Sequence, residues 1–214
     1  MLSRVCLLKG KGATPFESYA RRTATTVMLV LQTYLFFGLI LHKVVWEVLR
    51  RKGKEKPVEI KSFSLSAVKA VKVGILLGIL LQIWLPNVLP ISARPFLLQV
   101  CGVAIYTIGL LTAIAARFQL GDNWANIETG QVLSRQEIVA KGVYAYVRHP
   151  IYIGDLLLLL GLELAVNSWL VLGVLILAPI VMLKAIKEER MLAGELPGYD
   201  AYCERSKRFI PFVF

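Results

Sequence analysis

The chain has 214 residues, of which 57% are hydrophobic, and its mean hydropathy is +0.63. This apolar content exceeds that of ordinary globular proteins and excludes a water-soluble domain of average composition. The formal net charge of +11 would suit a nucleic-acid-binding protein, but the basic residues flank apolar runs instead of clustering in one polar domain. The composition therefore favours a membrane protein with no nucleic-acid partner.

Apolar runs, taken in chain order, predict an all-α polytopic membrane protein with about five transmembrane helices. A helix needs roughly 20 apolar residues to cross the hydrocarbon core of a bilayer. We expect spans at about 25–49, 67–89, 95–116, 151–166 and 168–186. The last two spans are separated only by Asn167 and Ser168, so they are predicted to form a tight antiparallel hairpin.

The basic residues predict how the chain is oriented in the membrane. With five spans, the loops 50–66 and 117–149 share one side with the C-terminal segment, and together they hold most of the 25 lysines and arginines. The positive-inside rule places this side in the cytosol and the N-terminus outside. The basic run from Arg50 to Lys56 is also expected to contact anionic membrane lipids.

Polar residues divide the chain into two predicted regions. They concentrate in 119–152 and 184–210. The candidate functional region is therefore 117–214, which comprises a connector, the hairpin and the C-terminal segment. Residues 1–116 are predicted to form an N-terminal membrane region of three helices.

The three cysteines are far apart and the chain has only two histidines. The sequence therefore predicts neither a disulfide framework nor a metal site.

The predicted hairpin brings two polar groups together at one cytosolic mouth. If the chain reverses at Asn167 and Ser168, a residue of the fourth helix and a residue of the fifth helix lie at the same depth in the membrane when their residue numbers add up to about 335. Pro150 suits the first turn of the fourth helix and His149 its N-cap, where free N–H groups and the helix dipole favour an anion. Glutamates on the fifth helix can accept bonds from ammonium, hydroxyl or sulfonium groups. The converging residues are Arg148, His149, Pro150 and Tyr152 with Lys184, Glu188 and Glu189.

Each of these features has an ordinary alternative. Arg148 and His149 also fit a basic pair at the membrane boundary, and the nearby tyrosines fit an interfacial aromatic belt. Glu188 and Glu189 also fit the solvated end of a helix. Their convergence favours a site for a zwitterionic ligand. Asp155 and Glu163 lie within the fourth span and are expected to face the interior of the bundle, Asp155 near Lys184.

An ordered set of motifs in the second region resembles one enzyme family. GVYAYVRHPIY occupies 142–152, KEERML occupies 187–192, and RFIPF occupies 208–212. With LGDNW at 120–124, this set resembles the isoprenylcysteine carboxyl methyltransferase family, including its prokaryotic members. The resemblance covers roughly 117–214. It implies a membrane methyltransferase that holds S-adenosylmethionine in a cytosolic pocket.

The resemblance also implies the residues of the site. Lys184 stands where the family has a substrate-binding arginine, and Lys184 or Arg148 is expected to hold the acceptor. Lysine keeps the charge but lacks the two-pronged grip of arginine on a carboxylate, so the acceptor stays open. Thr129 is an alternative to the first of the implied cofactor contacts. These contacts are Glu128, Gln136, Glu137, Ile138, Val139, Tyr144, His149, Pro150, Ile151, Tyr152 and Glu188.

The expected reaction is methyl esterification of a lipophilic or prenylated carboxylate. A carboxylate is ionised at pH 7 and needs no general base. An amine acceptor must first lose a proton, for which Glu189 or Tyr152 is a candidate base, so phospholipid N-methylation stays open. A nicotinamide-dependent sterol-type reductase and a non-enzymatic scaffold or transporter are further alternatives. The sequence leaves the oligomeric state undetermined.

Overall fold

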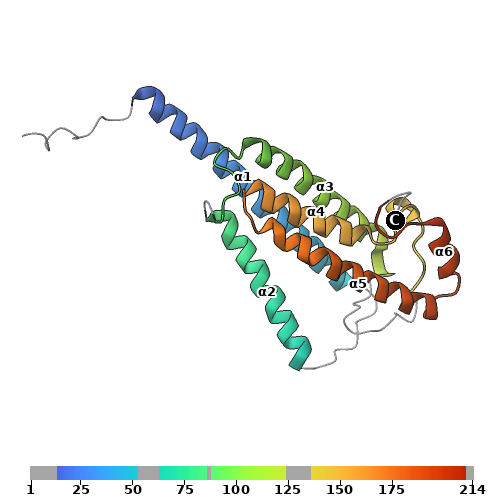
Figure 1. The fold of residues 1–214 in the computed structure, drawn as a ribbon. Helices are drawn as coiled ribbons and strands as arrows, with labels where there is room; N and C mark the ends of the chain where they lie inside the picture. Colours follow the sequence, from blue (N-terminus) through green and yellow to red (C-terminus); the bar gives the residue numbers. More distant parts are fainter. Residues whose placement is uncertain (1–13, 53–62, 86–87, 124–135, 211–214) are drawn as a thin grey trace, which may run out of the picture.

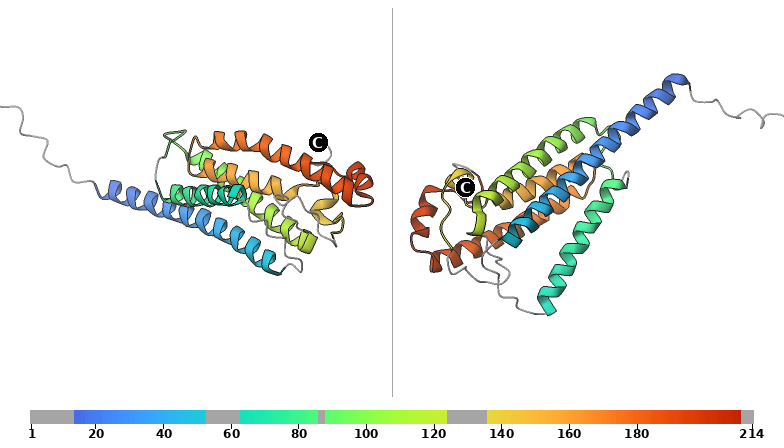
Figure 2. Two further views of the ribbon diagram at one scale, coloured as in Figure 1. Left: turned by 90° about the horizontal axis from the view of Figure 1, so that it is seen from below. Right: turned by 180° about the vertical axis from the view of Figure 1, so that it is seen from behind.

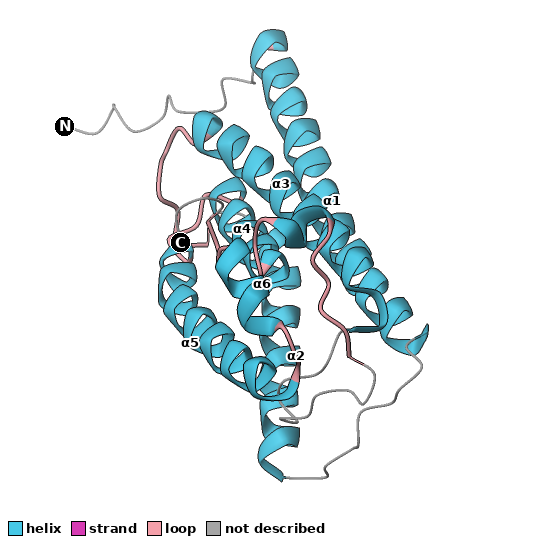
Figure 3. Cartoon of the chain, turned by 90° about the vertical axis from the view of Figure 1, so that its right-hand side faces the viewer, coloured by secondary structure: helices cyan, strands magenta, loops and turns pink. Residues whose placement is uncertain are grey.

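The computed structural model describes residues 14–52, 63–85, 88–123 and 136–210, and all regular structure in these ranges is helical (Figure 3). The predicted all-α class is therefore confirmed. Four helices lie side by side, while α2 leans away from the others toward its own first residues (Figures 1 and 2). The helices are α1 (Pro15–Lys52), α2 (Phe63–Trp84), α3 (Phe96–Leu120), α4 (Pro150–Ala165), α5 (Val171–Glu195) and α6 (Tyr199–Arg205), with the short 3-10 helices η1 (Gly121–Asn123) and η3 (Gly142–Ala145).

Two of the helices, α1 and α3, are long and apolar enough to cross a membrane. The apolar part of α2, Ala70–Trp84, is shorter. Large apolar side chains on the outward faces, such as Phe37, Leu111 and Ile176, are well over half exposed, as expected for surfaces that contact lipid. Membrane crossing by α2, α4 and α5 stays a prediction.

The helix ends differ from the predicted span limits because hydropathy marks the apolar part of a helix and not its ends. α1 begins well before residue 25, where Thr14 and Glu17 bond to each other's backbone N–H groups in a capping box. α5 continues past residue 186 through a Lys- and Glu-rich segment that favours helix. α2 ends at Trp84, before the predicted limit of 89.

Helices α3 and α4 pack with their backbones in close contact. A Cβ atom at Gly161 would collide with the backbone of Tyr106, and one at Gly109 would collide with the backbone of Leu158. Small residues allow this approach between helices in a membrane. The predicted boundary between 116 and 117 falls inside α3, so α3 belongs physically with the helices of the second region.

The connection between α4 and α5 is held at the end of the bundle opposite α6. Asn167, which adopts a positive φ of 58°, accepts a bond at Oδ1 from the Ser92 amide and donates from Nδ2 to the Ser92 carbonyl, at 3.0 and 2.8 Å. The Trp169 amide donates to the Leu89 carbonyl at 2.9 Å. The core beside this connection consists of Leu35, Leu39, Ile83, Tyr106, Leu110, Leu158, Leu162 and Ala165.

Candidate functional site

The C-terminal segment lies along the residues that lead into α4. The Arg148 amide donates to the Lys207 carbonyl at 2.8 Å, and the Lys207 amide donates to the Tyr146 carbonyl at 2.9 Å. Pro150 occupies the first turn of α4, where its missing N–H leaves no intrahelical bond unmade, and His149 is the N-cap residue. These contacts fix the start of α4 against the end of the chain.

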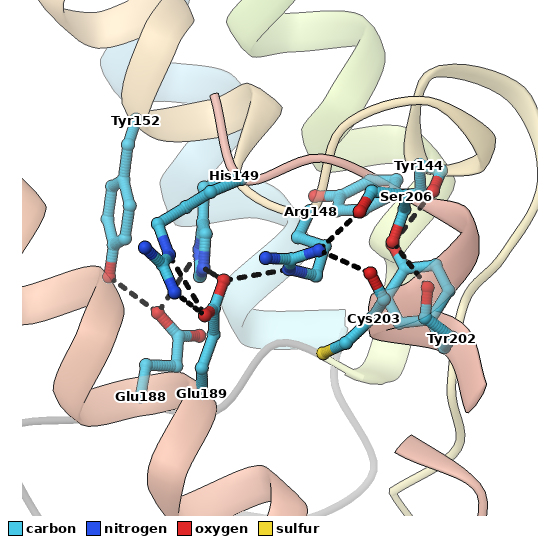
Figure 4. Close-up of polar contacts among 10 residues, drawn as sticks. Tyr144, Arg148, His149, Tyr152, Glu188, Glu189, Tyr202, Cys203 and Ser206 are labelled. Atoms are coloured by element: carbon cyan, nitrogen blue, oxygen red, sulfur yellow. Dashed lines mark hydrogen bonds and ion pairs between the residues drawn. The ribbon is translucent and has the colours of Figure 1, made fainter. Parts of the chain in front are cut away.

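Glu189 on α5 is the centre of a buried ionic network (Figure 4). Its Oε1 lies 2.8 Å from Arg148 Nε and 3.0 Å from His149 Nε2, and its Oε2 lies 2.7 Å from an Arg208 guanidinium nitrogen. Burial alone would raise the pKa of Glu189, but the hydrogen bonds from these three residues outweigh it and hold the pKa far below the ordinary value. Both oxygens of Glu189 are thus engaged within the fold.

Arg148 is directed mainly toward the C-terminal segment. Besides its bond to Glu189, the guanidinium donates to the backbone carbonyls of Cys203, at 3.0 Å, and Ser206. The side chain is only 10% exposed. These bonds join α4, α5 and the residues after α6 into one wall.

Glu188, next to this network, faces a different environment. Tyr152 donates a hydrogen bond to its Oε2 at 2.9 Å, and His149 Nδ1 lies 3.7 Å from the same oxygen. The His149 and Tyr152 rings are stacked, with centroids 5.4 Å apart. Burial raises the pKa of Glu188 by more than His149 and Tyr152 lower it. Glu188 is therefore a desolvated carboxyl group held by few partners.

A cleft opens in front of Glu188. It collects most of the cofactor residues that the resemblance implied, although they come from three separate stretches of the chain. Those that line it are Gln136, Glu137, Ile138, Val139, Tyr144, His149, Ile151, Tyr152 and Glu188, and Arg148 also forms part of its wall. Pro150 and Lys184 lie beside the cleft without lining it. Glu128 lies outside the described residues.

The end of α3 and the following η1 hold two segments at the cleft. Asn123 of η1 accepts a hydrogen bond at Oδ1 from the Glu137 amide at 2.7 Å. Gln119 of α3 accepts one at Oε1 from the Val143 amide at 2.8 Å, and the adjacent Gly142 has a positive φ of 61° that suits glycine. The 136–139 wall is therefore fixed by η1, and the start of η3 by α3.

Several cleft residues were missed by the sequence reasoning. Leu192 and Leu196 follow Glu188 by one and two helical turns, so helical spacing alone could have found them. Asn123 belongs to the LGDNW motif but was not predicted to contact a ligand. Tyr199 and Tyr202 were not predicted as site residues, yet they line the cleft, and Tyr202 donates to the Tyr144 carbonyl at 2.7 Å.

Two curated bacterial proteins are similar in sequence to part of the chain. The cobalt-zinc-cadmium resistance protein CzcN of Cupriavidus metallidurans is 38% identical over 76 residues, which are 35% of this chain and 35% of that protein. The nickel-cobalt-cadmium resistance protein NccN of Alcaligenes xylosoxydans xylosoxydans is 29% identical over 110 residues, which are 50% of each. The chain thus matches between about a third and a half of the length of these relatives.

One solved structure and one family model extend these similarities. The structure of a eukaryotic intramembrane Ras methyltransferase, isoprenylcysteine carboxyl methyltransferase, superposes with a TM-score of 0.51 and 18% identity, over 87% of this chain and 73% of that one. Residues 97–195 match the model of the phospholipid methyltransferase family. The family resemblance inferred from the motifs is therefore confirmed as a similarity: residues 97–195 match the phospholipid methyltransferase family model, and the chain shares its fold with the intramembrane methyltransferase structure.

Proposed function

We propose that this chain transfers a methyl group from S-adenosylmethionine to the polar end of a lipid-like acceptor, with the carboxylate of an isoprenoid or related lipid as the first candidate. One observation carries the proposal. Residues from three parts of the chain converge on a cleft that exposes the desolvated Glu188 carboxyl beside apolar helices. The family match of residues 97–195 supports the methyl-transfer chemistry.

The cleft suits S-adenosylmethionine in the chemistry of its walls. Tyr144, Leu192 and Tyr199 offer aromatic and apolar surfaces for a nucleoside base. Glu188 offers negative charge for an ammonium or sulfonium group, and the first turn of α4 offers N–H groups for a carboxylate.

The residues of the chain act mainly by positioning. S-adenosylmethionine supplies a methyl group on a positively charged sulfur, and the transfer forms a bond from the acceptor to that carbon as the carbon–sulfur bond breaks. Glu188, held by Tyr152, orients the positive charge. A carboxylate acceptor is already ionised, so alignment and removal of water suffice. We assign the acceptor contact to Lys184, since the guanidinium of Arg148 is engaged with Glu189 and backbone carbonyls.

A second candidate acceptor is the amine of a phospholipid. The raised pKa of Glu188 favours it, because a carboxylate with a higher pKa is a better base for removing a proton from an ammonium group. Tritium-labelled methyl groups distinguish the two reactions. A methyl ester releases labelled methanol in base, whereas an N-methyl amine retains the label.

We further propose that the cleft faces the cytosol and the N-terminus lies outside. The contact between His42 and Asp155 places the C-terminal end of α1, with Arg50, Arg51 and Lys52, toward the cleft end of the bundle. This concentration of basic residues supports a cytosolic position. Asp200→Cys, at an exposed site on α6, should react with an impermeant maleimide in inside-out vesicles and not in intact cells; the reverse pattern would overturn the orientation.

Calorimetric titration of detergent-purified protein tests the cofactor site. The wild-type protein should bind S-adenosylmethionine and S-adenosylhomocysteine with micromolar affinity. Glu188→Gln should weaken S-adenosylmethionine binding by about 10- to 100-fold, the loss expected for a bond to a charged group, and should weaken S-adenosylhomocysteine binding less because its sulfur is uncharged. Glu195→Gln, an exposed position on the same helix, is the matched control.

The wild-type titration decides whether the proposal stands. No heat from either ligand with folded wild-type protein would overturn it. Equal affinities in Glu188→Gln and Glu195→Gln would remove Glu188 from the site.

A further inference from the structure

Arg117 is buried at the cleft end of α3. It is among the largest fully buried side chains of the described residues, with 1% of its surface exposed. Ala113 and Ala116, on the same face of α3, are also buried, whereas the next residue, Phe118, faces outward. A guanidinium loses favourable hydration when it is buried. This position is therefore costly unless Arg117 stabilises something that an apolar side chain could not.

The close packing of α3 on α4 sets the level of Arg117. The Ala113 backbone lies against Gly154, where a Cβ atom would collide with it, and the two helices run in opposite directions. One turn beyond Ala113, Arg117 is therefore level with Pro150 in the first turn of α4. Arg117 thus lies beside the cleft, although it is not one of the residues that line it.

Arg117 holds the turn that follows α3. Its Nη1 donates a hydrogen bond to the Gly121 carbonyl at 2.8 Å, and its own carbonyl accepts one from the Gly121 amide. The φ of 55° at Gly121 lies in the left-handed region that favours glycine. The side chain and the backbone of Arg117 thus both bind the first residue of η1.

η1 connects Arg117 to one wall of the cleft. Its last residue, Asn123, accepts a hydrogen bond at Oδ1 from the Glu137 amide, and its carbonyl accepts one from Gln136 Nε2 at 3.4 Å. Gln136 and Glu137 both line the cleft. The contacts from Arg117 to the 136–139 wall therefore pass through the three residues of η1 alone.

Arg117 also acts on a second wall of the cleft. Its charge is close enough to Tyr144 for an electrostatic interaction, and Tyr144 is a buried residue that lines the cleft. Gln119, two residues after Arg117, binds the amide of Val143, next to Tyr144. One buried cation is thus adjacent to the supports of both walls.

We propose that Arg117 is a positioning residue for the cofactor, which fixes the 136–139 segment relative to Tyr144 without touching the ligand. This inference rests on the proposed S-adenosylmethionine site. A loosened η1 lowers affinity because binding must then order the wall again. The preference for a charged sulfonium, which Glu188 supplies, does not depend on Arg117.

The variant Arg117→Met tests this role in the full chain, purified in detergent. It removes the charge and the bond to Gly121 but keeps an unbranched side chain. Replacing a buried charge by an apolar group is often neutral or stabilising, and the nearby Asp122 is exposed, so the unfolding temperature should not fall. Titration should nevertheless show affinities for S-adenosylmethionine and S-adenosylhomocysteine that are both about tenfold weaker, with their ratio unchanged. Arg117→Lys keeps the charge and a donor and should recover most of the loss.

Hydrogen exchange followed by mass spectrometry locates the effect. The Glu137 amide should exchange about tenfold faster in Arg117→Met, while amides within α4 and α5 should keep the wild-type rate. Gly121→Ala strains the same turn, and its Cβ would meet no atom within 4 Å, so it should give the same pattern. Arg94→Met, at an exposed position just before α3, is the matched control and should change neither affinity nor exchange.

The outcomes separate this inference from the proposed function. Wild-type affinity and exchange in Arg117→Met would overturn the inference. Faster exchange throughout α4 and α5 with a lower unfolding temperature would also overturn it, because the role would then be a general structural one. Weaker binding without faster exchange at Glu137 would indicate direct contact with the ligand and would contradict positioning. If the wild-type protein binds neither ligand, the proposed function fails whatever the exchange shows.

Discussion

The two ends of the α4–α5 pair use polar groups in different ways. At the far end, the Asn167 amide bonds to both backbone groups of Ser92, and the contact is complete within the fold. At the cleft end, Glu189 is likewise saturated by Arg148, His149 and Arg208, but the adjacent Glu188 faces the cleft. Polar groups whose bonds are all made hold the structure, whereas a buried carboxyl with few partners is available to a ligand.

The adjacent glutamates sharpen this contrast. Both carboxyl groups lose water when the chain folds, yet the pKa of Glu189 is lowered and that of Glu188 is raised. The difference arises because three cationic or donor side chains bond to Glu189, whereas burial dominates at Glu188. Two consecutive residues of α5 thus have different roles, one structural and one proposed for binding.

The largest effect is expected on the stability of the Glu189 network. Glu189→Gln removes the negative charge that Arg148 and Arg208 require, and breaking a buried ion pair costs about 3–5 kcal/mol. Thermal unfolding in detergent should therefore occur at a clearly lower temperature. Glu195→Gln, at an exposed site, should unfold like the wild-type protein, and an unchanged transition in Glu189→Gln would show that the network does not stabilise the cleft end.

Lowering the pH should affect binding through Glu188 and stability through Glu189 in different pH ranges. Because the pKa of Glu188 is raised, it loses its charge at a pH above the ordinary value of 4.5, and S-adenosylmethionine binding should fall by about tenfold per pH unit below that midpoint. Glu189 has a lowered pKa, so the stability it contributes is present above 4.5 and is lost only as the pH falls toward its folded value.

Equilibrium dialysis measures the pH range in which S-adenosylmethionine binding is lost. Thermal unfolding over the same pH series measures the range in which stability is lost. Binding should be lost at a higher pH than stability. The raised pKa of Glu188 favours the neutral form in the folded state, so protonating it does not destabilise the fold. Coincident loss of binding and structure would contradict the assignment of separate roles.

Which residues of the motif region lie together could largely be predicted from sequence, because polar and aromatic side chains in an ordered set of motifs are recognisable in the sequence itself. Most implied cofactor residues, including Tyr144 and Glu188, line one cleft as the resemblance suggested. The predicted hairpin geometry also placed the start of α4 near the end of α5, where Tyr152 and Glu188 are now in contact. Both predictions depend on helical spacing and on one short turn, which are local properties of the chain.

Contacts made by backbones and by distant segments were not predictable in this way. The α3–α4 interface depends on glycines such as Gly109 and Gly161, which carry no side-chain signal in a hydropathy window. The predicted functional region consequently began at 117, whereas the family match begins at 97, near the first residue of α3. Arg208 was noted only within a motif, and its bond to Glu189 spans elements that only the fold brings together.

Substitution of Asn167, in the connection between α4 and α5, is expected to lower stability moderately without weakening S-adenosylhomocysteine binding. Asn167→Ala removes the bonds to Ser92 and places a Cβ-bearing apolar residue at a φ of 58°, which together should cost about 2 kcal/mol. Asn167→Gly relieves the backbone strain and should recover about 1 kcal/mol. Thermal unfolding measures both variants. S-adenosylhomocysteine affinity should stay at the wild-type value, and a parallel loss would mean that the two ends are coupled.

The smallest effect is expected at the hydrogen bond that holds Glu188. Tyr152→Phe removes the donor while keeping the ring that stacks on His149, so the loss should be about 1 kcal/mol, or roughly fivefold in S-adenosylmethionine affinity. The same bond lowers the pKa of Glu188, so its removal should move the acid loss of binding to a higher pH. Titration at several pH values detects both changes. An affinity loss without this shift would indicate that Tyr152 contacts the ligand directly and does not act through Glu188.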